Sequence, residues 1–169
     1  NSLDEAAEWL NQHASDGVYN TMTVNLSYKQ YNQTGITAYG EKLGALAAKA
    51  NNAGIKLIPV FFKSGELASS KQYMAQYISN IMGKFYKGRR FEGWCLFDQT
   101  STDEPSDYKN VFQYIFSYVR YVFPNQPMFA APMLDASQQA DSTAADFNNY
   151  MWQLSDVVAF NTPDGAEVS

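Results

Sequence analysis

The sequence predicts an α/β fold with a parallel sheet, in the form of part of a (β/α) barrel of TIM type. Short apolar runs alternate with amphipathic helical patterns along the whole chain. Strict alternation of this kind gives parallel strands joined by right-handed crossovers. A complete eight-stranded barrel needs about 250 residues, so this chain of 169 residues would supply about five strands. An open parallel α/β sheet is the alternative fold.

Apolar residues recur at helical spacing in several stretches, which predict helices over residues 3–14, 41–51, 70–86, 105–122 and 143–154. Runs rich in β-branched and aromatic residues lie between them and predict strands over 18–26, 55–62, 91–98, 128–134 and 156–160. The second helix is expected to end at Gly54, because glycine readily adopts the left-handed backbone that closes a helix. Residues 27–35 are expected to form a polar loop that carries Tyr28 and Tyr31.

Charge and hydropathy exclude two classes of partner. The net charge is −5 and the pI is about 4.8, with no basic stripe along the chain. A nucleic-acid-binding protein needs such a stripe, so we expect no nucleic-acid partner. No apolar run is long enough to cross a bilayer as a helix, so we expect no membrane span. The chain opens at Asn1 without a signal-like segment, and we expect it to be a processed or excised piece of a larger barrel.

The sparse cysteine and histidine content limits the chemistry of any site. Cys95 is the one cysteine, so the chain has no internal disulfide and no cysteine-based metal cluster. His13, the one histidine, lies in a predicted helix far from any strand end, and we expect a surface or helix-end role for it. No strand is followed by a glycine-rich phosphate loop, and no calcium-loop pattern is present. We therefore expect neither a cofactor nor a metal.

The strand at 91–98 organises the candidate site. It begins as an apolar run and ends on Asp98 and Gln99, which is typical of a buried parallel strand that opens into a functional loop. Successive strand residues face opposite sides of a sheet. Strict alternation therefore places Cys95, Phe97 and Gln99 on one face and leaves Asp98 on the other.

Acidic side chains follow several predicted strands, and ligands of strand–helix folds bind where the strands end. Glycoside hydrolysis commonly uses two carboxyl groups, one to protonate the leaving oxygen and one to attack or to activate water. Asp98 and Asp164 are the predicted acidic pair. The predicted substrate-binding residues are Asp135, Asn161, Glu66, Asn25 and Tyr28. For each single carboxylate, stabilisation of a loop or of a helix start is the structural alternative.

Several short segments resemble successive landmarks of a bacterial domain-of-unknown-function family. They lie at residues 93–99, 123–128, 131–133 and 156–165, and residues 53–57 fit an upstream alanine-glycine step before a strand. The family is regarded as a glycoside-hydrolase-like (β/α) barrel. The resemblance therefore implies a bacterial hydrolase that acts on an oligo- or polysaccharide and is secreted or held at the cell surface.

The sequence departs from this family at the end of the strand at 91–98. The family tends to carry glutamate where this chain has Gln99, which implies that the functional side chain is Gln99 and that Asp98 either faces the covering helices or caps the loop. An amide cannot transfer a proton or act as a carboxylate nucleophile. A non-catalytic carbohydrate-binding or cell-surface module on the same fold is therefore the alternative function.

The edges of a partial barrel need a partner. The strands at 55–62 and 91–98 should pair in parallel within the sheet, because helical patterns separate them. The outermost strands then carry backbone groups without a ladder partner. We expect a partner chain or further sequence to cover those edges.

Overall fold

A computed structural model describes residues 2–63, 70–85, 87–88, 90–100, 108–132 and 142–159. Its helices are α1 (Ser2–His13), the short 3-10 helix η1 (Ala14–Asp16), α2 (Tyr28–Asn52), α3 (Lys71–Phe85), α4 (Tyr108–Val122) and α6 (Ser142–Leu154). Its strands are β1 (Thr21–Asn25), β2 (Lys56–Lys63), β3 (Trp94–Thr100) and β4 (Met128–Pro132). No helix in these ranges is long and apolar enough to span a membrane.

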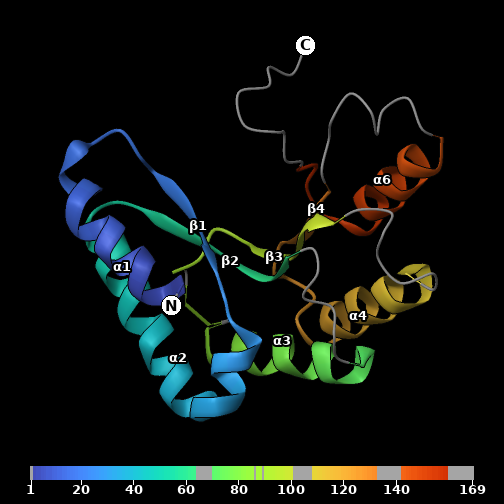
Figure 1. Ribbon diagram of the computed structural model, residues 1–169, viewed down its shortest axis with the longest axis horizontal. Coiled ribbons are helices and arrows are strands. Elements are labelled where there is room, and N and C mark those ends of the chain that lie inside the picture. The colour runs from blue at the N-terminus through green and yellow to red at the C-terminus, as the bar shows by residue number, and fades with distance from the viewer. Residues whose placement is uncertain are drawn as a thin grey trace.

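The described strands form one parallel sheet in the order β1-β2-β3-β4. Strands that follow one another along the chain are neighbours in the sheet, whereas a doubly wound sheet reverses its strand order partway. Figure 1 shows the strands in the middle of the molecule, with α1 and α2 near β1 and α6 near β4. Every described α-helix contributes to one buried cluster against the sheet. The chain therefore has the fold of part of a (β/α) barrel.

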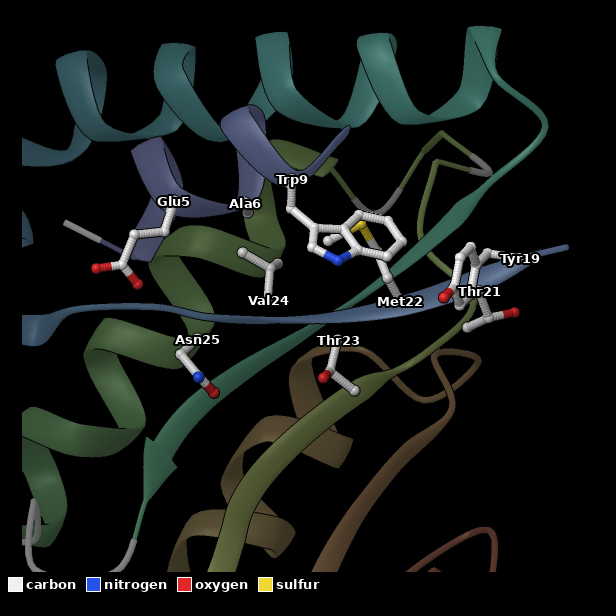
Figure 2. Close-up of a pocket in the computed structure, with 9 residues that line it drawn as sticks. All are labelled: Glu5, Ala6, Trp9, Tyr19, Thr21, Met22, Thr23, Val24 and Asn25. Carbon is white, nitrogen blue, oxygen red and sulfur yellow. The ribbon is translucent and has the colours of Figure 1, made fainter. Parts of the chain in front are cut away.

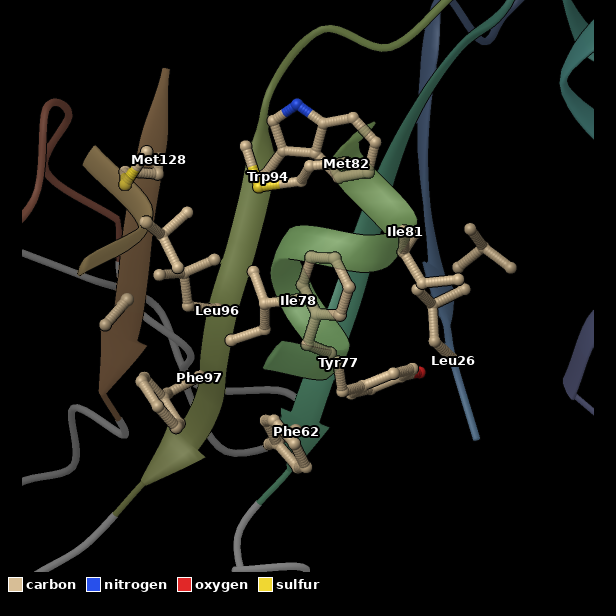
Figure 3. Close-up of a cluster of buried hydrophobic side chains, with 14 of the residues drawn as sticks. Leu26, Phe62, Tyr77, Ile78, Ile81, Met82, Trp94, Leu96, Phe97 and Met128 are labelled. Carbon is tan, nitrogen blue, oxygen red and sulfur yellow. The ribbon is translucent and has the colours of Figure 1, made fainter. Parts of the chain in front are cut away.

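Aromatic packing builds the core between the sheet and its helices. The ring of Phe97 stacks on Phe62 with centroids 5.9 Å apart and lies 4.4 Å from Phe112 of α4. Tyr77 of α3 contacts the rings of both Phe61 and Phe62. Figure 3 shows Phe62, Tyr77 and Phe97 with Leu96 of β3 around α3. Because burying each such side chain stabilises a fold by about 1.5–3 kcal/mol, this cluster holds the helices on the sheet.

A smaller buried cluster lies apart from this core. Its buried members are Val60 of β2, Cys95 of β3, and Phe129 and Ala131 of β4. No residue of a described helix belongs to it. It therefore lies on the face of the sheet that turns away from the helices. In a barrel that face lines the interior, and we call it the axis face.

The structure confirms the helices predicted at 3–14, 70–86 and 143–154. Their ends agree within about two residues, which is the usual uncertainty of a helix boundary. The predicted loop at 27–35 was wrong, because α2 begins at Tyr28. The Ser27 side chain caps the helix by accepting a hydrogen bond from the Gln30 N–H at 3.2 Å. Gly35 interrupts the helical backbone with φ 83°, and the helix then runs on to Asn52.

The end of α2 is the one that the sequence predicts. Gly54 has φ 77°, in the left-handed region. The N–H of Gly54 donates to the Asn51 carbonyl, and the N–H of Ile55 donates to the Ala50 carbonyl. This pair of bonds is the Schellman motif, which places the buried Ile55 directly before β2.

The predicted fifth strand does not form over residues 156–159. Instead, the Asp156 carboxylate accepts a hydrogen bond from the N–H of Met128, and the Ser155 hydroxyl accepts one from the N–H of Ala130, both at 2.9 Å. Pro132, the next outward-facing residue of β4, has no N–H. The backbone makes one bond of the ladder type here, from the N–H of Asp156 to the Met128 carbonyl at 2.9 Å. Two side chains and a proline take the place of the N–H donations that β4 would make to a fifth parallel strand.

Candidate functional site

The carboxyl ends of the parallel strands meet at one edge of the sheet. Asn25 is the last residue of β1, and Lys63 is the last residue of β2. Asp98 lies near the end of β3 and is the register partner of both Lys63 and Ala131. The carboxylate of Asp98 and the ammonium group of Lys63 therefore occupy opposed strand positions at the edge where barrel enzymes bind their ligands. The Asn25 amide ends β1 at the level of Val60, three residues before Lys63 along β2.

Asp98 lies on the axis face of β3. Its register partner Ala131 belongs to the axis-face cluster, and paired residues of neighbouring strands point to the same side. Burial raises the pKa of the Cys95 thiol, and the negative charge of Asp98 raises it further. This second effect requires the carboxylate of Asp98 to lie near Cys95, which is itself a member of that cluster.

The predicted alternation along β3 was wrong. Leu96 and Phe97 both belong to the helix-facing core, while Cys95 lies on the axis face. The pairing of β3 with β4 is irregular between Cys95 and Phe97, and a bulge there turns Phe97 and Asp98 to the faces opposite to those that strict alternation gives them. A second irregularity lies between Asp98 and Thr100. The expectation that Asp98 faces the covering helices therefore fails. The backbone of Gln99 continues β3, but its side chain lies outside the described residues.

Asn25 lies on the same face as Asp98. It is the register partner of Val60, which belongs to the axis-face cluster. Figure 2 shows Thr23 and Asn25 pointing away from α1, whereas Met22 and Val24 point toward it. Asn25 is half-buried, so its amide remains accessible at the end of β1.

Tyr28 packs into an aromatic cluster at the start of α2. Its ring lies 5.1 Å from that of Tyr77 and 6.3 Å from that of Phe62. It also lines a cavity of about 220 Å³ together with Ser27, Lys29 and Phe62. Most of its surface therefore serves packing, while one side faces a small hollow beside the ends of β1 and β2.

A buried tyrosine fixes the backbone at this cavity. The hydroxyl of Tyr39 accepts a hydrogen bond from the N–H of Ser27 at 2.8 Å. Burial raises the pKa of Tyr39, so its hydroxyl stays protonated. The sequence did not single out Ser27, Lys29, Phe62 or Lys63, although each stands directly at a strand end or a helix start.

Four of the predicted site residues lie outside the described residues, namely Glu66, Asp135, Asn161 and Asp164. The predicted pairing of Asp98 with Asp164 therefore stays a prediction. His13 ends α1, where its Nδ1 lies 2.9 Å from a carboxylate oxygen of Asp16 and its ring is tilted by 32° against that of Trp9, with centroids 4.8 Å apart. The expectation of a helix-end histidine is confirmed.

No protein-family model and no curated protein sequence matches this chain. The domain-of-unknown-function assignment therefore remains a resemblance. Solved structures do match the fold, at low sequence identity and over part of their own length.

Glycoside hydrolases are among these structural neighbours. The glycoside hydrolase GH5_18 from Streptomyces cattleya, in complex with GlcNAc, has a TM-score of 0.60 at 14% identity, over 78% of this chain and 39% of its own. The endoglucanase Cel5A from Pseudomonas stutzeri, in complex with cellobiose, has a TM-score of 0.60 at 14% identity, over 73% and 41%. A glycoside hydrolase of family 5 from Bacteroides vulgatus has a TM-score of 0.58 at 14% identity, over 85% and 35%.

The chain thus spans about two fifths of the first of these structures. The structural match shows a shared (β/α)-barrel fold. At an identity of 14% it shows the fold alone, so any chemistry has to be argued from the residues of this chain.

Proposed function

We propose that this chain forms part of a (β/α) barrel that hydrolyses glycosidic bonds, with Asp98 as one of its two carboxyl groups. The observation that carries this proposal is the placement of Asp98 on the axis face, near the carboxyl end of β3. A carboxyl group at that position can protonate a leaving oxygen, attack a sugar carbon or activate water. The fold shared with glycoside hydrolases supports the same reaction class.

The remaining described groups of this edge suit a sugar. The Asn25 amide both donates and accepts hydrogen bonds, which matches the hydroxyl groups of a carbohydrate. The Lys63 ammonium donates only, and its strand position is opposite Asp98. Asp164 is our candidate for the second carboxyl group, with Asp135, Glu66 and Asn161 as further binding residues.

A non-catalytic carbohydrate-binding module is the second candidate function. The cavity beside Tyr28 favours it, because this partly exposed aromatic ring after the end of β1 offers an apolar surface to a sugar ring. Gln99 favours it too, since the resembled family tends to carry an acid there. In that case the protein binds oligosaccharide and turns none over.

Assays of binding and hydrolysis on the same ligands separate the two functions. The ligands are cello-oligosaccharides, GlcNAc-containing oligosaccharides and a panel of aryl glycosides, chosen because the structural neighbours carry cellobiose and GlcNAc. Release of reducing ends or of the aryl group supports hydrolysis. Binding in calorimetry without any release supports the binding module, and neither binding nor release contradicts both.

A further inference from the structure

The outer edge of β1 presents an unpaired hydrogen-bonding ladder. The carbonyl of Asn20 and the N–H of Leu26 both bond to β2. Bonding to one neighbour uses every second residue of a parallel strand, so the N–H and C=O groups of Thr21, Thr23 and Asn25 point away from β2. No other described segment pairs with them.

A groove runs along this edge beneath α1. It has a volume of about 430 Å³ and is lined by Glu5, Ala6, Trp9, Tyr19 and β1. Figure 2 shows Trp9 above Met22, and Glu5 toward the end of the strand that holds Asn25. The rings of Trp9 and Tyr19 meet edge to face with centroids 4.9 Å apart. The groove therefore has an apolar wall on its helix side and backbone donors and acceptors at its floor.

The opposite edge of the sheet is closed. The outward N–H groups of Met128 and Ala130 bond to the side chains of Asp156 and Ser155. Arg120 holds Asp156 in place through an ion pair of 3.1 Å and also donates to the Leu154 carbonyl. Among the described residues, the two edges of this sheet thus differ, since the β1 edge offers an open ladder beside a groove and the outward N–H groups of β4 are already bonded.

We propose that the groove between α1 and β1 binds an extended peptide segment as an added strand parallel to β1. All three strand pairs of the sheet are parallel. In a (β/α) barrel a helix covers each pair of neighbouring strands, and α1 already lies where it would cover β1 and a strand added beside it. Such β-strand addition takes its affinity from backbone bonds and its specificity from alternate side chains. The segment carries apolar residues toward Trp9 and Met22, and a basic residue at its carboxyl end near the Glu5 carboxylate.

Hydrogen exchange on the whole chain tests this directly. The probe is a capped peptide that alternates valine and threonine and ends in lysine. In the chain alone, the amides of Thr23 and Asn25 exchange fast and those of Met22 and Val24 exchange slowly. Addition of the peptide slows exchange at Thr23 and Asn25 by about tenfold or more, as expected when each gains a hydrogen bond.

Two variants and a spin label sharpen the test. Thr23→Pro removes the outward N–H and lowers peptide affinity about tenfold, whereas Thr23→Val keeps the N–H and the branched shape and leaves affinity unchanged. Trp9→Ala, which leaves the backbone of β1 intact, also weakens binding. A paramagnetic label on the amino end of the peptide broadens the Thr21 signals more than those of Asn25 if the added strand is parallel.

Several outcomes overturn the proposal. One is that the peptide leaves amide exchange at Thr23 and Asn25 unchanged, and another is that it slows exchange at Met128 and Ala130 instead. A third is that the spin label broadens the signals of Asn25 more than those of Thr21. Slow exchange at Thr23 without peptide, together with a dimer in sedimentation, assigns the edge to a second copy of this chain and also overturns it.

Discussion

The pKa of the Cys95 thiol lies above its ordinary value of 9.0. Burial is the larger cause, and the negative charge of Asp98 is the second. Below that value the thiol is protonated in both the folded and the unfolded chain. Above it the unfolded thiol ionises while the folded one does not, so the free energy of unfolding falls as pH rises. We predict that Cys95→Ala lowers this alkaline slope in urea denaturation at a series of pH values from about 8 to about 10.5. Equal slopes in the two proteins would contradict the burial of the thiol.

Phe97 is fully buried between β3 and α4, with ring contacts to Phe62, Phe112 and Phe116. Replacing it by alanine leaves a cavity in the helix-facing core. We predict that Phe97→Ala lowers the free energy of unfolding by about 3–5 kcal/mol. The control Tyr121→Ala removes a ring that is 87% exposed and should change stability by less than about 0.5 kcal/mol. A small effect of Phe97→Ala would mean that Phe97 does not face the helices.

The residue scale also shows where sequence-based prediction fails. The polar end of β3 could be read directly, because Asp98 and Gln99 follow an apolar run. The face of Asp98 could not, because the bulge that sets it is a feature of the pairing of β3 with β4, which the alternation along one strand does not report. Two adjacent large apolar residues, Leu96 and Phe97, are the one local signal of such a break in alternation.

At the scale of elements, Asp156 joins three parts of the fold. Asp156 lies two residues after the end of α6. Its carboxylate accepts a hydrogen bond from the Met128 N–H of β4 and forms an ion pair with Arg120 of α4. Met128 is fully buried, so loss of the acceptor leaves a buried donor without a partner. We predict that Asp156→Ala lowers the free energy of unfolding by about 1–3 kcal/mol and speeds amide exchange at Met128.

The conservative variant Asp156→Asn tests the reason for that loss. Its amide oxygen can still accept from Met128, while the charge that pairs with Arg120 is gone. Because a half-exposed ion pair is worth about 0–1 kcal/mol, this variant should be the milder of the two. Equal losses would show that the ion pair, and not the β4 edge, is what Asp156 stabilises.

The order of the elements could be predicted because each rests on a local pattern. Gly54 ends α2 by its own backbone freedom. The apolar residues at helical spacing within 70–86 include most of the buried face of α3, although Tyr73 is exposed. The start of α2 was missed although Ser27 and Gln30 stand at capping distance in the sequence. The fifth strand failed for a tertiary reason, since side chains of Ser155 and Asp156 took the donors of β4.

At the scale of the whole molecule, the chain is a parallel segment of a barrel, with its helices on one face and its candidate site at one edge. The chain spans 35–41% of three barrel hydrolases that share its fold. Within the described ranges, the outer ladder of β1 has no strand partner, whereas residues 155 and 156 bond to the outer edge of β4. The fold follows from sequence periodicity, whereas the assignment of site residues needs the register of β3.

The proposed hydrolase function depends most on Asp98, and the hydrolysis rates of variants at Asp98 and Gln99 test its role. We predict that Asp98→Asn lowers kcat by about 100-fold or more, because it removes a carboxyl group from the axis face, and that Gln99→Glu leaves kcat unchanged. Asp4→Asn, which changes an exposed carboxylate of α1 that pairs with Lys42, is the matched control and should keep full activity. If Gln99→Glu instead creates or raises activity while Asp98→Asn mainly lowers stability, the functional position is Gln99 and the assignment of Asp98 is wrong.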